Sequence, residues 1–147
     1  MDARDVMTRE PVTLGPGATL GEAATLMRQE DCGSIPIVED GRLVGIVTDR
    51  DIVIRAVAAG KDPRSTPVSD VMSADPVCIE PGTSLDEAQE LMAERQVRRL
   101  PVVEDGKLVG ILVIGQVARR EPDEEQTGET LKEISQPKSG RGSHARG

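Results

Sequence analysis

The chain contains no phenylalanine, tyrosine or tryptophan among its 147 residues, so its core must be built from aliphatic side chains. A planar ligand could not stack on an aromatic ring and would have to lie between aliphatic side chains and arginine planes. Long apolar runs are also missing, because none approaches the roughly 18 residues that a membrane-spanning helix needs. The charged start of the chain, Met1 to Met7, argues against a signal peptide. We therefore expect a cytoplasmic protein with no membrane partner.

Cysteine, histidine and net positive charge are equally scarce. Cys32 and Cys78 are too few for a disulfide framework or a tetrahedral metal cluster, and the single histidine, His144, lies in a polar stretch. We expect both thiols to be buried and reduced, and we predict no metal site. Acidic residues outnumber basic ones by 26 to 18, which gives a net charge of −8. Such a chain lacks the overall positive field that a nucleic-acid partner would require.

The most informative feature that is present is an internal repeat with an offset of 65 residues. The segment Asp-Val-Met-Thr-Arg-Glu-Pro-Val that begins at Asp5 returns at Asp70 as Asp-Val-Met-Ser-Ala-Asp-Pro-Val. The segment Ile-Pro-Ile-Val-Glu-Asp-Gly-Arg-Leu-Val-Gly-Ile that begins at Ile35 returns, slightly altered, at Leu100. A unit of about 55 residues buries little surface alone. We therefore expect the two copies to pack together as a pseudo-twofold pair.

Each copy predicts the same order of elements: strand, helix, strand, strand, helix. In the first copy a strand at 11–14 is followed by a helix that begins at the capping pattern Thr19 to Glu22, which the second copy matches with Ser84 to Glu87. The strands 34–38 and 43–47 flank an Asp-Gly hairpin turn, and a final helix covers about 50–59, with 116–120 as its counterpart. The fold class is therefore α+β. The predicted organisation is repeat 1 at 3–60, a linker at 61–67, repeat 2 at 68–120, and a disordered polar tail at 121–147.

The two copies differ at a strand-to-helix junction. Thr48 and Asp51 of the first copy are replaced by Val113 and Gln116 in the second. A hydroxyl at such a junction can donate to a phosphate oxygen, and a carboxylate three residues later can accept hydrogen bonds from the two hydroxyls of a ribose. The same spacing is also a capping box that only closes the helix end, and the sequence alone leaves both interpretations open.

A second difference lies before the second strand of each copy. Arg98 and Arg99 stand where the first copy has Gly33 and Ser34. Two guanidinium groups suit the recognition of a polyphosphate, although they could equally be solvated or paired with some of the many carboxylates. If the copies pair about a twofold axis, the Thr48 end of one copy faces the arginine pair of the other. We then expect one competent cleft and one degenerate cleft.

These motifs together resemble a pair of CBS domains, the Bateman module, over roughly residues 3–120. The resemblance rests on Asp-Val-Met near the start of each copy, on Leu-Val-Gly-Ile after each hairpin, and on Gly-Ile-Val-Thr-Asp-Arg-Asp-Ile at 45–52, which is similar to the nucleotide-binding motif of the family. In more detail the chain resembles the small stand-alone CBS-pair proteins of actinobacteria, which include hypoxic-response proteins. The departures at Val113 and Gln116 put the second site in doubt.

The resemblance implies an adenosyl ligand, chiefly AMP, ADP or ATP, and less often S-adenosylmethionine, NAD or cyclic di-AMP. It implies that Thr48 holds a phosphate, that Asp51 holds the ribose, and that Ile46 and Arg50 flank them. For the base and the remaining phosphates it implies a second group of residues. These are Cys78, Val97, Arg98, Arg99, Leu100 and Pro101. It also implies a homodimer.

The functional expectation is a non-catalytic module that senses an adenine nucleotide and regulates a separate, unknown protein. The alternative is a stress-related interaction or structural dimer in which the nucleotide site is vestigial and Thr48 and Asp51 only cap a helix. An enzyme is not expected, because the one histidine lies in the polar tail and neither cysteine has a histidine near it in the sequence.

Overall fold

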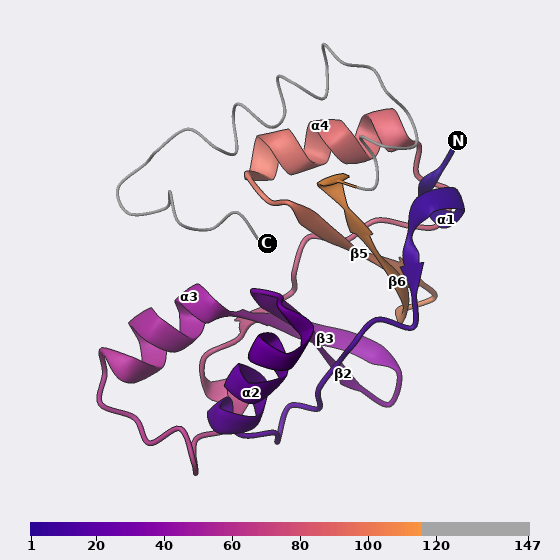
Figure 1. Ribbon diagram of the computed structural model, residues 1–147. Coiled ribbons are helices and arrows are strands. Elements are labelled where there is room, and N and C mark those ends of the chain that lie inside the picture. Colours follow the sequence, from indigo (N-terminus) through magenta and orange to yellow (C-terminus); the bar gives the residue numbers. More distant parts are fainter. Residues whose placement is uncertain (116–147) are drawn as a thin grey trace. The chain divides into compact units, whose positions relative to one another are not determined.

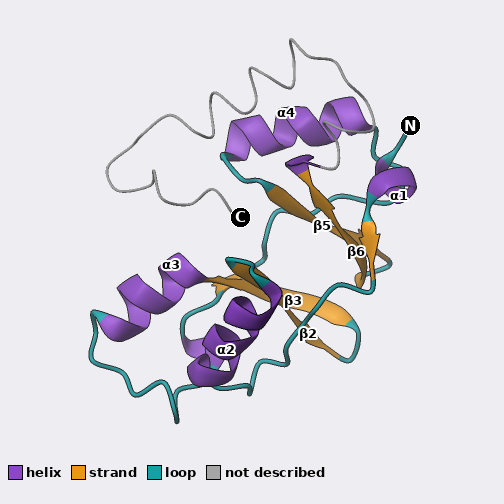
Figure 2. Ribbon diagram, in the orientation of Figure 1, coloured by secondary structure: helices purple, strands orange, loops and turns teal. Residues whose placement is uncertain are grey.

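The computed structural model describes residues 1–115 and divides them into two compact units (Figure 1). The first-repeat unit is Val12–Pro76, and the second-repeat unit joins Met1–Pro11 to residues 77–115. Both units combine helices with antiparallel strands, which confirms the α+β class (Figure 2). The helix expected at 116–120 and the disordered tail expected at 121–147 lie outside the described residues.

The first-repeat unit contains one three-stranded antiparallel arrangement and the helices beside it. In chain order its elements are α2 (Leu20–Glu30), β2 (Ser34–Glu39), β3 (Arg42–Thr48), α3 (Asp49–Ile52), the π-helical η1 (Val53–Val57), the 3-10 helix η2 (Val68–Asp70) and β4 (Ser73–Ala74). Strand β3 pairs with β2 on one side and with β4 on the other. The helix predicted at about 50–59 is thus α3 continued by η1.

The second-repeat unit repeats this plan with segments from both ends of the described chain. Its elements are α1 (Ala3–Val6), β1 (Thr8–Arg9), α4 (Leu85–Arg95), β5 (Arg99–Glu104) and β6 (Lys107–Val113). Strand β6 pairs antiparallel with β5 and with β1. No helix within residues 1–115 has the length and apolar character to cross a membrane.

The predicted helix starts and hairpin turns are confirmed. The side chain of Thr19 accepts the Glu22 N–H at the start of α2, and that of Ser84 does the same for Glu87 at the start of α4, both at 3.1 Å. Between β2 and β3, Asp40 and Gly41 have φ values of 53° and 80°, and the turn between β5 and β6 repeats them. Two consecutive positive φ values are typical of the type I′ turn that an Asp-Gly pair favours.

The strand expected at 11–14 is wrong. Only Leu14 makes a bridge: its N–H donates to the carbonyl of Pro36 at 3.2 Å, and its carbonyl accepts from Val38 N–H at 2.9 Å. In a parallel ladder the next bond would run from the N–H of residue 36 to the carbonyl of Val12. Proline has no N–H, so the pairing stops after one residue. Ile79 repeats this arrangement in the other unit, because its N–H donates to the carbonyl of Pro101 and its carbonyl accepts from the N–H of Val103.

The start of each sequence repeat packs within the unit formed by the other repeat. Each unit has its own apolar core, and Val68 and Val71 lie in the core of the first-repeat unit while Ala3 and Val6 lie in that of the second. The Asp-Val-Met segment of one copy therefore docks on the Leu-Val-Gly-Ile segment of the other. The repeats recognised in the sequence and the compact units of the structure divide the chain at different points.

This exchange depends on a close approach at two glycines. A Cβ on Gly110 would lie 2.6 Å from Met7 Sδ and 2.9 Å from the Thr8 carbonyl oxygen, and one on Gly45 would meet Met72 and Ser73 in the same way. Only a residue without a side chain lets the short strands β1 and β4 pair at these positions. The methionine of each Asp-Val-Met motif is therefore repeated because it contacts the glycine of the Leu-Val-Gly-Ile motif in the other copy.

The expected linker 61–67 is an ordered part of the first-repeat unit. Its carbonyls cap α2, because Leu20 N–H donates to Thr66 and Gly21 N–H donates to Pro63, both at 2.9 Å. Within it, the backbone N–H and the guanidinium of Arg64 bond the carboxylate of Asp62 and hold the pKa of that group below its usual value. The first N–H groups of α2 are therefore satisfied by the segment that follows the repeat.

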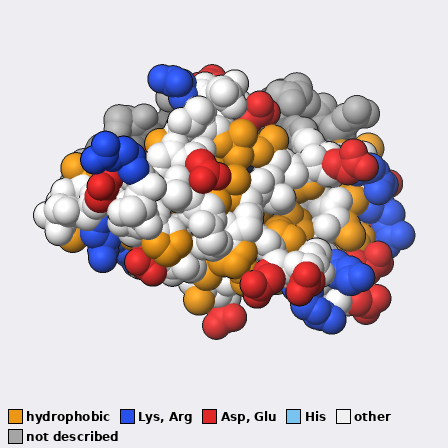
Figure 3. Space-filling view, turned by 90° about the horizontal axis from the view of Figure 1, so that it is seen from below, with side chains coloured by type: hydrophobic (Ala, Val, Ile, Leu, Met, Phe, Trp, Pro, Cys, Tyr) orange, Lys and Arg blue, Asp and Glu red, His pale blue; other side chains and the backbone are white. Residues whose placement is uncertain are grey.

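On the face shown in the space-filling view, acidic and basic side chains are mixed and lie mostly toward the edges, while apolar side chains are visible in the middle (Figure 3). No area of one sign of charge dominates this view of the described residues.

We predict that Gly110→Ala destabilises the protein by about 1–3 kcal/mol, because the added methyl group must displace Met7 or push β1 away from β6. The measurement is urea denaturation followed by far-ultraviolet circular dichroism, since the chain has no tryptophan. Gly17→Ala is the control, because nothing lies within 4 Å of a Cβ there. Equal stability of the two variants would contradict the close contact.

Candidate functional site

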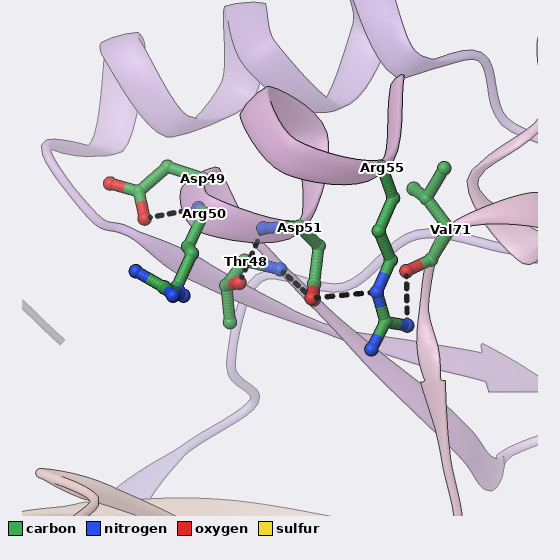
Figure 4. A network of polar contacts seen from close by, with 6 residues as sticks. All are labelled: Thr48, Asp49, Arg50, Asp51, Arg55 and Val71. Carbon is green, nitrogen blue, oxygen red and sulfur yellow. Dashed lines mark hydrogen bonds and ion pairs between the residues drawn. The ribbon is translucent and has the colours of Figure 1, made fainter. Parts of the chain in front are cut away.

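The residues singled out at 48 and 51 form a reciprocal capping box at the junction of β3 and α3 (Figure 4). The Asp51 N–H donates to Thr48 Oγ1 at 3.0 Å, and the Thr48 N–H donates to Asp51 Oδ2 at 3.0 Å. The capping interpretation of the spacing is therefore correct for this structure. A hydroxyl can accept and donate at once, so Thr48 can still donate to a phosphate oxygen.

The N–H groups that open α3 already have partners within the first-repeat unit. The Asp49 N–H donates to the Gly33 carbonyl at 2.9 Å, and the Arg50 N–H donates to Asp49 Oδ1 at 2.8 Å. With the Asp51 N–H held by Thr48, the first three donors of the helix are satisfied. A phosphate at this helix end would have to displace the Asp49 carboxylate from Arg50. The Thr48 hydroxyl is the donor that an anion could use without such a displacement.

The second oxygen of Asp51 faces an arginine. Arg55 Nε lies 3.9 Å from Asp51 Oδ1, while Arg55 Nη1 donates to the carbonyl of Val71 at 3.3 Å (Figure 4). A separation of 3.9 Å is too long for a hydrogen bond, so Oδ1 keeps the capacity to accept one from a ligand. The side chain of Asp51 is 13% exposed. The carboxylate is thus held by the protein through Oδ2, while Oδ1 has hydrogen-bonding capacity left.

Sequence reasoning missed Arg55 and Val71. The spacing of four residues between Asp51 and Arg55 on a helix is a signal that could have identified the pair. Nothing in the sequence indicates Val71, because it comes from the segment that the second repeat contributes to this unit.

Four of the ten predicted site residues lie in the first-repeat unit. Ile46 and Thr48 are two residues apart on β3 and therefore share one face of the sheet, where both are half-buried, while Val47 between them is buried. Asp51 follows at the junction, and Arg50 is exposed beside it. The structure thus brings together the residues to which the family motif assigns the phosphate and the ribose.

The other six predicted residues lie in the second-repeat unit. Leu100 is fully buried in the apolar core and Val97 packs against that core, so neither side chain is simply presented to a ligand. Pro101 is buried as well. Arg98 and Arg99 are half-buried and already make polar interactions, and Arg99 lies opposite Val113 in the ladder of β5 and β6. The roles of all ten residues in binding stay predictions.

The expectation of two buried thiols is wrong for one of them. Cys32 is half-buried and packs against the core of the first-repeat unit, but Cys78 is exposed. The neighbouring Ile79 turns inward to make its bridge with Val102, and successive side chains of an extended segment point to opposite faces. Cys78 therefore points outward. Within residues 1–115 no three His, Cys, Asp or Glu side chains are grouped so that they could hold a metal ion.

We predict that Thr48→Val, which removes the capping oxygen but keeps the shape of the side chain, lowers the free energy of unfolding by about 1 kcal/mol. Thr48→Ser keeps the acceptor for the Asp51 N–H and should change the free energy by much less. Urea denaturation of both variants is the measurement. A serine variant as unstable as the valine variant would show that the cap contributes little.

Comparison with known proteins gives the same family for both copies. Residues 3–57 and residues 68–122 each match the CBS domain family. The CBS domain-containing protein YhcV of Bacillus subtilis is 46% identical over 132 residues, which are 90% of this chain and 94% of that protein. Hypoxic response protein 1 of Mycobacterium tuberculosis is 39% identical over 122 residues, which are 82% of this chain and 85% of that protein.

Solved structures agree with this assignment. The crystal structure of Hypoxic Response Protein I with two coordinated zinc ions has a TM-score of 0.77 at 39% identity and covers 83% of this chain and 100% of that one. CBSX2 in complex with AMP has a TM-score of 0.71 at 30% identity, over 80% of this chain and 93% of that one. The CBS domain pair of protein MJ0100, in complex with 5′-methylthioadenosine and S-adenosylmethionine, has a TM-score of 0.70 at 25% identity, over 81% and 94%. The chain therefore belongs to the CBS domain family and carries two copies of the domain.

Proposed function

We propose that the protein is a non-catalytic regulatory module that binds an adenosyl ligand of the AMP, ADP or ATP type and reports its level to a separate protein in the cytoplasm. The observation that carries this proposal is the carboxylate of Asp51, which accepts the Thr48 N–H through Oδ2 and keeps hydrogen-bonding capacity at Oδ1. Two structural neighbours support the ligand class, since one is in complex with AMP and the other with 5′-methylthioadenosine and S-adenosylmethionine.

The chemistry of the residues suits a ribose phosphate. The vicinal hydroxyls of a ribose donate hydrogen bonds, and Asp51 Oδ1 is an acceptor with unused capacity. Thr48 supplies a hydroxyl donor for a phosphate oxygen, and Ile46 supplies apolar surface on the same face of the sheet. On the resemblance to the family, Cys78 and Val97 remain candidates for the base and Arg98 and Arg99 for the remaining phosphate charge, whereas Leu100 and Pro101, which the resemblance also implies, are buried.

A ligand that binds only the folded chain stabilises it by mass action, and this gives a sensor its signal. Regulation requires no bond to be made or broken. Among the described residues around Asp51, the polar groups are those that bind a diol and an anion, and no nucleophile is paired with a base. Binding without turnover is therefore the function that this chemistry favours.

We predict that AMP, ADP or ATP raises the melting temperature of the full chain and that Asp51→Asn abolishes most of the shift. At about 100 times its dissociation constant, a ligand should add roughly 2.7 kcal/mol of stability. The asparagine keeps an acceptor for the Thr48 N–H but loses the negative charge and the oxygen that faces the ligand. The measurement is a thermal melt followed by circular dichroism, with S-adenosylmethionine, NAD and cyclic di-AMP in the same panel.

The control for this experiment is Asp5→Asn. Asp5 closes a capping box of the same kind at α1, where its Oδ2 accepts the Asp2 N–H at 2.9 Å. This variant should melt with an unchanged ligand shift. No shift with any compound in the panel would overturn the sensor and favour the interaction dimer, in which Thr48 and Asp51 only cap the helix.

We also propose that the protein is a homodimer. The support is an exposed apolar surface on η1, where Val53, Ile54 and Val57 are 57%, 49% and 65% exposed. Exposed aliphatic side chains gathered on one helical turn are typical of a contact surface. This surface is compatible with either proposed function.

We predict that Val57→Glu shifts the protein from dimer to monomer, because a dimer contact on η1 would bury the new charge. Size-exclusion chromatography with light scattering measures the mass. Val12→Glu is the control, since Val12 is exposed to 38% but lies outside η1. A monomeric wild-type protein, or a Val57→Glu variant that remains dimeric, would contradict the prediction.

A further inference from the structure

Arg55 lies between Asp51 and Val71 in Figure 4 and joins two segments that are twenty residues apart in the sequence. Its Nε is 3.9 Å from Asp51 Oδ1, one helical turn earlier. Its Nη1 donates to the carbonyl of Val71 at 3.3 Å, in the segment between η2 and β4. The arginine side chain is 55% exposed, although the carboxylate beside it is largely buried.

The anchor on Val71 decides how well Arg55 can orient the carboxylate. An exposed pair four residues apart on a helix is a weak interaction whose side chains keep much of their freedom. Val71 is only 1% exposed and belongs to the core of the first-repeat unit, so its carbonyl has a fixed place. A guanidinium bonded to that carbonyl is itself held in place.

The carboxylate of Asp51 thus has a hydrogen bond at one oxygen and a positive charge near the other. Thr48 N–H holds Oδ2 at 3.0 Å, and Arg55 lies beside Oδ1 at a distance that leaves the lone pairs of this oxygen usable. The hydrogen bond at Oδ2 and the positive charge beside Oδ1 together favour one orientation of the carboxylate. A preferred orientation lowers the cost of ordering the group when the two hydroxyls of a ribose bind to it.

The sequence repeat shows that Arg55 and Asp51 are not retained together in the second copy. Arg55 corresponds to Arg120 and Val71 corresponds to Val6, so arginine and valine occur in both copies. Asp51 corresponds to Gln116, so only the first copy has the carboxylate. The second copy therefore has the same arginine in its sequence without the carboxylate that Arg55 would orient.

We infer that Arg55 is a positioning residue for the proposed ligand site: anchored on the Val71 carbonyl, it holds Asp51 Oδ1 in the orientation that accepts the ribose hydroxyls. This inference rests on the proposed function and adds a residue outside the family motif at 45–52. It also makes ligand affinity depend on the docking of the segment that the second repeat contributes to the first-repeat unit.

The test is a double-mutant cycle on the full chain, with AMP, ADP and ATP as probes and isothermal titration calorimetry as the measurement. Arg55→Met should weaken the binding of the tightest probe roughly threefold to tenfold, because the hydrogen bond that anchors Arg55 on Val71 is lost together with the charge beside Asp51. In the Asp51→Asn background, titrated at the higher ligand concentrations that its weaker binding requires, the same change should have no further effect, because the group that Arg55 orients is already lost. Arg55→Lys should stay weakened, since a single ammonium group does not reproduce the two-sided guanidinium contact.

Arg64→Met is the matched control. It removes the same charge from a side chain that is 89% exposed and pairs with Asp62, away from Asp51. Urea denaturation of each variant without ligand measures any change in stability separately. A merely structural role would change the affinity by the same factor in both Asp51 backgrounds, which would overturn the inference.

The other outcomes are equally distinct. An affinity that is unchanged or tighter in Arg55→Met, full rescue by lysine, or equal weakening by Arg64→Met would overturn the positioning role while leaving the nucleotide sensor intact. Absence of binding to the wild-type chain, or binding that is indifferent to Asp51→Asn, would overturn both proposals. Weakening by Arg55→Met that disappears in the Asp51→Asn background supports the inference.

Discussion

The close approach of a short strand to a glycine is the constraint on which both units depend. At Gly110 and at Gly45 the backbone of the neighbouring segment and a methionine side chain occupy the space that a Cβ would need. This contact places β1 beside β6 and β4 beside β3, and it carries two aliphatic residues of each incoming segment into a core that contains no aromatic ring. Without the contact, each core would lose residues that the other repeat supplies.

The candidate site lies on the same framework. Strand β3 contains the glycine that receives β4, and it ends three residues later at Thr48, where the capping box begins. Val71 precedes β4 by two residues and provides the carbonyl that holds Arg55. The candidate ligand-binding carboxylate is therefore oriented by two segments that this one glycine contact brings together. Fold and site share a single structural cause.

Much of this arrangement could be predicted from the sequence, for physical reasons that differ from element to element. Helix caps and Asp-Gly turns are local, so the patterns at Thr19, Ser84 and Asp40 were sufficient to locate them. The pairing at Leu14 stops because Pro36, on the neighbouring strand β2, has no N–H to donate toward this segment. The periodicity of apolar residues does not show which neighbouring segment a given backbone position faces. The exchange of the segments before Val12 and Val77 is a choice between two copies with nearly identical motifs, and local patterns cannot distinguish them.

The exchange also orders events while the chain is being made. The first-repeat unit is continuous from Val12 to Pro76, so all of its contacts become available once that stretch has been synthesised. The second-repeat unit cannot be completed until the ribosome has reached Ile111, because Thr8 pairs with that residue, about a hundred residues further along the chain. During that interval Ala3 and Val6 have no core to enter, and the half that contains Asp51 can already be folded. The contacts of the two nearly equal copies thus become available at different times during synthesis, the local ones first and the long-range ones last.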